Sequence, residues 1–163
     1  MSTDFEWGKV RGRIEIPADV QAEARRSGEE HHQEVENMLG GNPMLKQLNE
    51  FNIGHLPLRW FERIGREYWF PDDEVGALGF DLDFEADPQL LMTTGIRDRT
   101  EFFGPTYLLV LANGGLEFCQ GAQQHRPKPG EWFIFNFALP HEVRGDETST
   151  SLVVLSQSLL LNR

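Results

Sequence analysis

The sequence predicts a mainly β domain with a helical N-terminal layer. Three observations support this class: apolar and acidic residues alternate at 80–85, short apolar runs follow one another after residue 66, and turn residues separate these runs. Many short strands with no helix between them are typical of an antiparallel sandwich or barrel. The expected later strands cover 89–96, 107–112, 116–119, 132–137 and 151–161.

Length and composition indicate one soluble domain over residues 1–163. The chain has 163 residues, 39% of them hydrophobic, and a chain of this size buries about 70% of its unfolded surface. The net charge of −11 argues against direct nucleic-acid binding, because a phosphate backbone repels such a protein. No apolar run is long enough to span a membrane. With no secretory signal at the start and Cys119 as the single cysteine, we expect a cytoplasmic protein without disulfides.

The chain divides into an N-terminal part, residues 1–65, and a β body, residues 66–163. In the first part, alternation from Val10 to Ile16 predicts a strand. At the start of the β body, alternation at 80–85 predicts a strand with Phe80, Leu82 and Phe84 toward the core and Asp81, Asp83 and Glu85 outward.

Several helices are expected between residues 17 and 64. Pro17 suits the first position of a helix. The spacing Ser27-Gly-Glu-Glu30 is that of a capping box and predicts the start of a second helix, which Gly40-Gly-Asn-Pro43 ends. Apolar spacing predicts two more short helices, at 45–51 and 58–64.

A family resemblance lies in the second half of the chain. Residues 129–144 read Pro-Gly-Glu-Trp-Phe-Ile-Phe-Asn-Phe-Ala-Leu-Pro-His-Glu-Val-Arg, a turn, a strand, a bend and a histidine, His141. This segment resembles the strand pair that carries the distal metal histidine in double-stranded β-helix (jelly-roll) domains, as in cupins and Fe(II)/2-oxoglutarate-dependent oxygenases. Asn113-Gly-Gly-Leu-Glu-Phe118 similarly resembles the Gly-Gly hairpin of the oxygenases. The resemblance implies a cupin-like jelly roll.

The resemblance implies a divalent metal, Fe(II) or another ion, at the mouth of the barrel. His141 and Asp98 are the predicted ligands, since such a site needs two histidines and one carboxylate. The position of the other histidine, two residues before Asp98, holds Ile96, which has no ligating atom. A third ligand is therefore expected from elsewhere, with Glu101 and His55 as candidates.

The sequence matches the binding site for 2-oxoglutarate, the cosubstrate of the oxygenases, less well. The family places a basic residue about ten positions after the distal histidine, whereas residues 147–154 here contain none. Tyr107, Arg144 and Ser151 are the predicted cofactor-binding residues: Arg144 supplies a charge that can face the cavity, and the two hydroxyls supply hydrogen bonds.

Two functions stay open from the sequence. The first is a divergent oxygenase-like or cupin-like protein that acts on an unknown substrate through a metal at the barrel mouth. If it is an enzyme, this protein would be a non-haem iron dioxygenase. The second is a catalytically inactive jelly-roll domain that binds a small ligand, or a basic protein partner through its acidic surface. Residues 67–96, with eight acids and no Lys, Arg or His, supply that surface.

Overall fold

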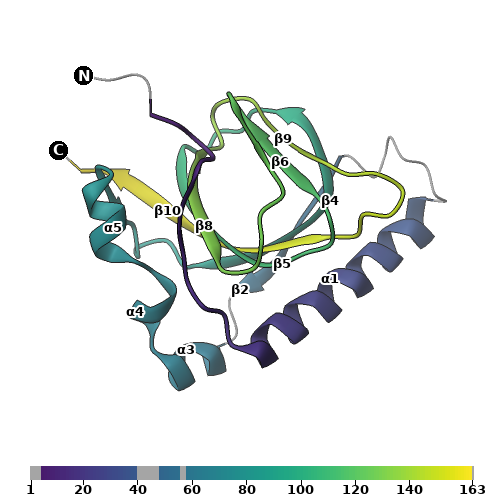
Figure 1. The fold of residues 1–163 in the computed structure, drawn as a ribbon, viewed down its shortest axis with the longest axis horizontal. Helices are drawn as coiled ribbons and strands as arrows, with labels where there is room; N and C mark the ends of the chain where they lie inside the picture. The colour runs from purple at the N-terminus through teal and green to yellow at the C-terminus, as the bar shows by residue number, and fades with distance from the viewer. Residues whose placement is uncertain (1–4, 40–47, 56–57, 163) are drawn as a thin grey trace.

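A curled antiparallel sheet forms the centre of the molecule (Figure 1). The computed structural model describes residues 5–39, 48–55 and 58–162. The described strands pair in the order β1-β8-β5-β10-β4-β9-β6-β7, while β2 pairs with β4 and β3 pairs with β10. All of these pairs are antiparallel. The strands are β1 (Val10–Arg13), β2 (Leu48–His55), β3 (Phe80–Leu82), β4 (Gln89–Arg99), β5 (Pro105–Asn113), β6 (Glu117–Gln120), β7 (Gln123–His125), β8 (Glu131–Asn136), β9 (His141–Arg144) and β10 (Leu152–Leu161).

Both faces of the sheet are buried along its central strands. In β5, Leu109 and Leu111 belong to an outer cluster, whereas Leu108 and Val110 belong to an inner cluster on the concave side. Successive side chains of a strand point to opposite faces, so a strand with two buried faces is apolar throughout. This double burial explains the continuous apolar run at 107–112.

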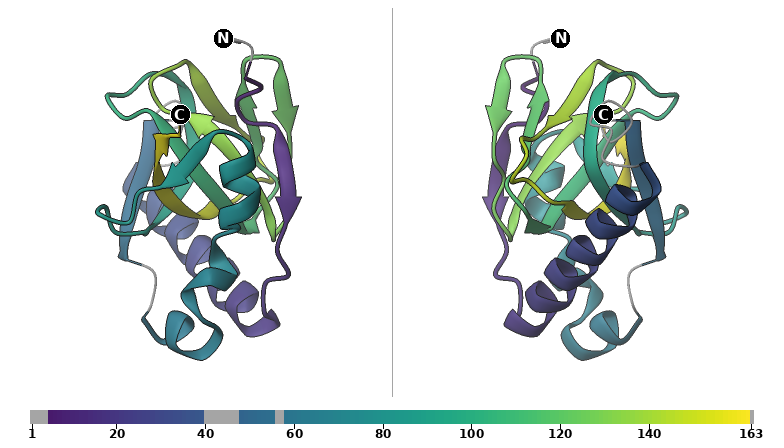
Figure 2. Two further views of the ribbon diagram at one scale, coloured as in Figure 1. Left: turned by 90° about the vertical axis from the view of Figure 1, so that its left-hand side faces the viewer. Right: turned by 90° about the vertical axis from the view of Figure 1, so that its right-hand side faces the viewer.

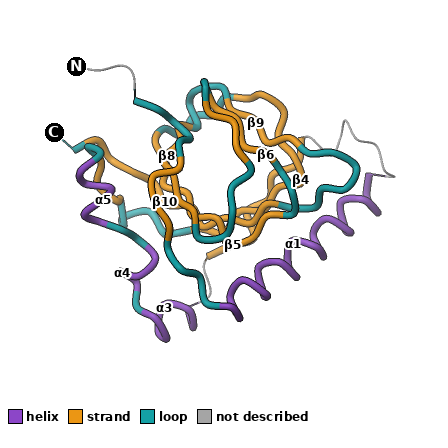
Figure 3. Tube along the Cα trace, in the orientation of Figure 1, coloured by secondary structure: helices purple, strands orange, loops and turns teal. Residues whose placement is uncertain are grey.

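Four described helices lie on one side of the sheet (Figures 2 and 3). They are α1 (Ala18–Leu39), α3 (Leu58–Ile64), α4 (Arg66–Trp69) and α5 (Asp72–Ala77). Helix α1 packs along β5, β10 and β4 and buries Val20, Ala24 and Val35. The aromatic rings of Trp60 and Trp69 complete the outer cluster. None of the described helices is both long and apolar enough to cross a membrane.

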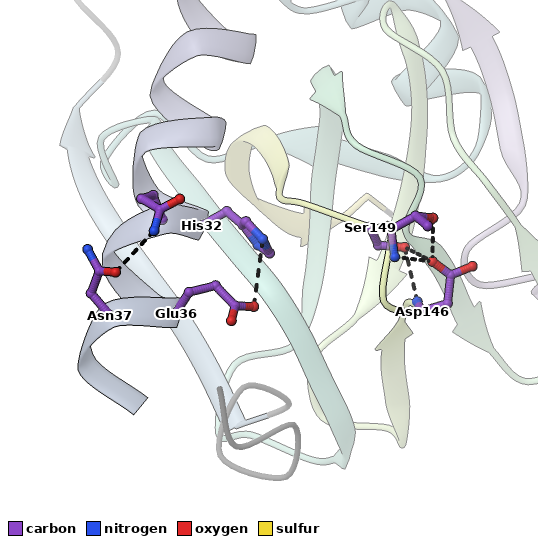
Figure 4. A network of polar contacts seen from close by, with 7 residues as sticks. His32, Glu36, Asn37, Asp146 and Ser149 are labelled. Carbon is purple, nitrogen blue, oxygen red and sulfur yellow. Dashed lines mark hydrogen bonds and ion pairs between the residues drawn. The ribbon is translucent and has the colours of Figure 1, made fainter. Parts of the chain in front are cut away.

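The predicted break in the first helix is wrong, because α1 runs through Ser27–Glu30 without interruption. Gly28 is buried against the sheet, where a Cβ atom on it would lie 3.0 Å from Val153 Cγ2. The glycine therefore allows close packing of the helix on β10 rather than ending a helix. Beyond it, Gln33 donates a hydrogen bond to Asn37 at 3.0 Å and His32 contacts Glu36 at 3.7 Å, one turn apart (Figure 4).

Two other local predictions are corrected and one is confirmed. The helix predicted at 45–51 is wrong for its described residues, which begin β2 and pair with β4; residues 45–47 lie outside the described part. The strand predicted at 80–85 ends at Leu82, and Phe84 is exposed rather than in the core. The helix predicted at 58–64 is confirmed as α3.

The N-terminal segment joins the two ends of the strand order, β1 and β7. Gly8 donates its N–H to the carbonyl of Ile134 in β8 at 2.8 Å. The Gly8 carbonyl also lies 2.7 Å from His125 Nε2 in β7. The His125 ring packs against Phe118 and Phe133, so this histidine is half-buried at the seam. These contacts curl the sheet around its inner cluster.

We expect Gly130→Ala to lower the free energy of unfolding by at least about 2 kcal/mol in urea denaturation. Gly130 has a φ of +93°, and a Cβ atom there would lie 2.2 Å from the carbonyl oxygen of Ile14. Gly121→Ala is the matched control: its φ is +57° and nothing lies within 4 Å of the added Cβ, so we expect a loss of about 1 kcal/mol. Equal losses would show that the close approach of Ile14 is unimportant.

Candidate ligand-binding pocket

His141 opens β9 and points into the concave side of the sheet. Only 2% of the residue is exposed. Its Nδ1 lies 3.0 Å from the carbonyl oxygen of Leu139, which can only accept a hydrogen bond, so Nδ1 carries the proton in the neutral ring. Nε2 is then an acceptor, and within the described part of the chain this buried atom has no hydrogen-bond partner.

Aromatic rings surround the imidazole of His141. The rings of Phe135 and Phe137 lie edge-on to it, with centroids 5.5 and 5.4 Å away. Burial lowers the pKa of His141, because the charged ring loses its hydration, and the charge of Arg99 lowers it further. The hydrogen bond to Leu139 and the charges of Glu101 and Asp98 oppose this shift only in part. The ring is therefore neutral at pH 7.

A small cavity of about 30 Å³ lies beside His141. Besides His141, only Thr93 among its described lining residues has a polar side chain, and the Thr93 hydroxyl accepts a hydrogen bond from Gly95 N at 3.0 Å. The other lining residues are apolar: Leu91, Met92, Ile96, Leu108, Phe118, Phe135, Phe137, Val143, Leu152 and Val154. The unpartnered nitrogen of His141 thus lies in a largely apolar space.

Gln120 fixes the turn that leads to His141. Its side-chain NH2 donates to the carbonyl of Asn136 at 2.7 Å and lies 3.3 Å from that of Leu139, and its Oε1 accepts from Asn136 N at 2.9 Å. The amide of Gln120 is buried on the neighbouring strand β6. Because Leu139 also accepts from His141, Gln120 helps to hold the imidazole in its orientation.

The cavity adjoins a much larger opening, the mouth, of about 570 Å³. Leu91 and Phe137 line both spaces and so form their junction. The mouth is lined by Ala86, Asp87, Gln89, Leu91, Glu101, Phe103, Thr106, Phe137, Ser156 and Ser158. Together the cavity and the mouth form one inner pocket, apolar at its deep end near His141 and mixed at its entrance.

The predicted metal ligands lie in different environments. A β-bulge separates the pairs Ile96–Val143 and Arg99–His141. Directly paired residues share a face of the sheet, so the extra residue places Arg99 beside His141, and Asp98 is exposed at the end of β4. Arg99 forms an ion pair with Glu101, the carboxylate predicted as a candidate third ligand.

The donor set around His141 does not complete a three-ligand metal site in the described part of the chain. No three His, Cys, Asp or Glu side chains gather there in a way that could hold a metal ion. Ile96 is buried in the inner cluster and has no ligating atom. The side chain of His55 lies outside the described part. A metal at Asp98 and His141 therefore stays a prediction, and we assign no chemistry to it.

The three predicted cofactor-binding residues lie apart from the inner pocket. Tyr107 is in the outer cluster and donates its hydroxyl to the carbonyl of Trp69 at 2.7 Å. Ser151 faces α1 and lines a separate cleft of about 140 Å³. Arg144 is exposed and pairs with Glu117 at 2.8 Å. The structure thus places none of them beside His141.

The loop between β9 and β10 contains the first part of the 147–154 segment, in which the oxygenase family carries its basic residue. Asp146 organises this loop: its Oδ1 accepts hydrogen bonds from the N–H and the hydroxyl of Thr148, at 2.8 and 2.6 Å, and from the hydroxyl of Ser149 at 3.3 Å (Figure 4). These bonds lower the pKa of the Asp146 carboxyl group. The loop is therefore held by its own side chains.

The sequence singled out Glu101, as a candidate third metal ligand, but not Gln120 or the other residues of the mouth. An isolated polar residue at the end of an apolar strand is a weak signal for Gln120, since only the tertiary fold shows that it contacts the 136–140 turn. Asp87 and Ser158 are far apart in sequence, and β3 pairing with β10 brings their segments together.

Comparisons with known proteins do not decide the fold class. No family model matches the sequence, and no curated protein matches it. One solved structure with partial similarity is an HTH_3 family transcriptional regulator from Vibrio cholerae, at 14% identity and a TM-score of 0.32. The match covers 64% of this chain and 63% of the regulator, less than two thirds of its length. This degree of likeness supports no conclusion about function. The structure itself shows a mainly β protein with a curled antiparallel sheet.

We expect the buried state of His141 to make the wild-type protein less stable as the pH falls from 7 to 5. The unfolded chain binds a proton near its ordinary pKa of about 6.5, whereas the folded His141 has a lower pKa and resists protonation. His141→Leu removes this titration. Urea denaturation at several pH values should show wild type losing stability relative to the variant on acidification. Parallel curves would contradict the lowered pKa; His31, also buried with a lowered pKa, is present in both proteins.

Proposed function

We propose that this protein is a jelly-roll-like domain that binds a small organic ligand in the inner pocket. The ligand places an apolar group in the cavity and donates a hydrogen bond to Nε2 of His141. One observation carries this proposal: a buried acceptor with no partner among the described residues, at the deep end of a pocket that widens into an open mouth.

The energetics of the unpartnered nitrogen favour a ligand. A buried acceptor with no hydrogen bond costs about 1–3 kcal/mol, which a bound donor would recover. A single water fits a cavity of about 30 Å³, but an ordered water typically needs two to four polar partners. The side chains of His141 and Thr93 are the only polar ones among the described lining residues. An apolar molecule with one donor group matches the lining better.

The element pattern supports the jelly-roll assignment. The segment that resembles the metal-histidine strand pair forms β8, a turn and β9, with His141 as the first residue of β9. The Gly-Gly segment connects β5 to β6, but these two strands do not pair with each other, so the predicted Gly-Gly hairpin is wrong. Ligands of closed or curled antiparallel sheets are commonly held in the mouth of the barrel, where the inner pocket opens here.

A metal-dependent enzyme is the second candidate. Its support is the orientation of His141, because a ring whose Nδ1 donates to a backbone carbonyl presents Nε2 as metal-binding histidines do. The described donor set leaves that candidate incomplete, so ligand binding ranks first. Capture of a basic protein by the acidic 67–96 surface stays a further prediction.

The neutral phenol p-cresol tests the proposed function. We expect it to bind with a dissociation constant of about 1 mM, consistent with its eight non-hydrogen atoms, and to shift the NMR signals of Leu91 and Met92. The isosteric 4-fluorotoluene lacks the donor and should bind about 5- to 10-fold more weakly, since one hydrogen bond is worth about 1 kcal/mol.

Two variants separate the hydrogen bond from the pocket. In His141→Leu, p-cresol and 4-fluorotoluene should bind equally, because the acceptor is gone and the cavity stays apolar. In Leu91→Trp, the indole should fill the junction and weaken both compounds. The proposal fails if p-cresol does not bind wild type, or if it keeps its advantage over 4-fluorotoluene in a folded His141→Leu protein.

A further inference from the structure

The mouth of the inner pocket has a negative lining. Among its described lining residues, Asp87 and Glu101 are carboxylates and none is basic. Gln89, Thr106, Ser156 and Ser158 add neutral polar groups. The chain as a whole carries a net charge of −11, so its long-range field attracts cations and repels anions.

The turn that carries Asp87 is fixed to β10. Gln157 is buried and donates its side-chain amide to the carbonyls of Asp83 and Ala86, at 2.5 and 2.9 Å. Asp83 N donates to the carbonyl of Ser158 at 2.9 Å. This turn therefore holds Asp87 at the entrance rather than leaving it on a free loop.

The opposite wall of the mouth is fixed to the turn before His141. Glu101 N donates to the carbonyl of Phe137 at 2.8 Å, and Phe137 N donates to that of Gly104 at 3.2 Å. The rings of Phe103 and Phe137 meet edge to face with centroids 6.0 Å apart. Phe103 is 63% exposed and so presents a free aromatic face at the entrance.

The two carboxylates differ in how far their charge is already neutralised. Glu101 forms an ion pair with Arg99, so much of its charge is compensated. Asp87 is exposed, and no ion pair involving it occurs among the described residues. Asp87 therefore leaves one uncompensated negative charge at an entrance that also holds an exposed phenyl ring.

We propose that the ligand of the inner pocket is an organic cation with an apolar body, an inference that rests on the proposed function. Its ammonium group lies at the mouth, attracted by Asp87 and by the faces of Phe103 and Phe137, while its apolar body extends toward His141. The face of an aromatic ring attracts an ammonium group, and a nearby carboxylate adds a charge attraction. A dianion such as 2-oxoglutarate is disfavoured by the same charges.

Three phenols with different charges test this inference by isothermal titration calorimetry and NMR. Tyramine carries an ammonium group, p-cresol is neutral, and 4-hydroxyphenylacetate carries a carboxylate. We expect tyramine to bind about 3- to 10-fold more tightly than p-cresol, and 4-hydroxyphenylacetate to bind more weakly than both. The advantage of tyramine should shrink in 0.5 M salt, because salt screens exposed charges.

Matched charge variants assign the effect to the mouth. Asp87→Asn should reduce the preference for tyramine over p-cresol to about 2-fold or less. Glu147→Gln makes the same change of charge on an exposed residue. Glu147 precedes β10 and so lies beyond the end of that strand that is remote from Ser156 and Ser158. This variant should preserve the preference for tyramine. Binding of p-cresol should be unchanged in Glu147→Gln.

The outcomes separate the two proposals. If p-cresol binds but tyramine has no advantage, or if Asp87→Asn and Glu147→Gln reduce the advantage equally, the cation inference is overturned and the ligand-binding function stands. If p-cresol does not bind wild type, the proposed function is overturned, and the inference about its ligand falls with it.

Discussion

The structure depends on a sheet that is buried on both faces. The outer face is covered by α1 and α3–α5, and the inner face curls around its own apolar cluster. Polar groups on the inner side are costly unless they find partners, so those that occur there need an explanation. Most of them have one: Gln120 satisfies the backbone of the 136–140 turn. Nε2 of His141 has no partner among the described residues, and this buried acceptor gives the inner pocket its chemical character.

The position of His141 follows from this packing. The 136–140 turn returns the chain from β8 to β9, and the Leu139 carbonyl sets the orientation of the ring. Phe135 and Phe137 keep water from the imidazole and hold it neutral. The same Phe137 continues into the mouth, where the lining changes from apolar to acidic. The pocket thus has a hydrogen-bond acceptor at one end and negative charge at the other.

Much of the fold could be predicted from local patterns, and much of the site could not. The apolar runs correctly indicated a mainly β body, since β5, β8 and the first four residues of β10 contain stretches that are buried on both faces. Capping-box spacing at Ser27 was misleading because Gly28 serves the packing of α1 on Val153. The first half of β2 was mistaken for a helix, since its pairing with β4 depends on residues more than thirty positions away. The pattern around His141 marked a residue that lines the pocket. The β-bulge that leaves Asp98 exposed depends on the register between β4 and β9. The spacing of residues in the sequence does not predict this register.

The central claim is that His141 is a neutral, buried acceptor held by the Leu139 carbonyl. Nitrogen-15 NMR of the histidine side chains tests it most directly, with His141 assigned by comparison with His141→Leu. At pH 7 we predict a proton on Nδ1, none on Nε2, and a shift of the Nε2 signal when p-cresol is added. A protonated Nε2, or an imidazolium ring at pH 7, would contradict the account, because the pocket would then present a donor in place of an acceptor.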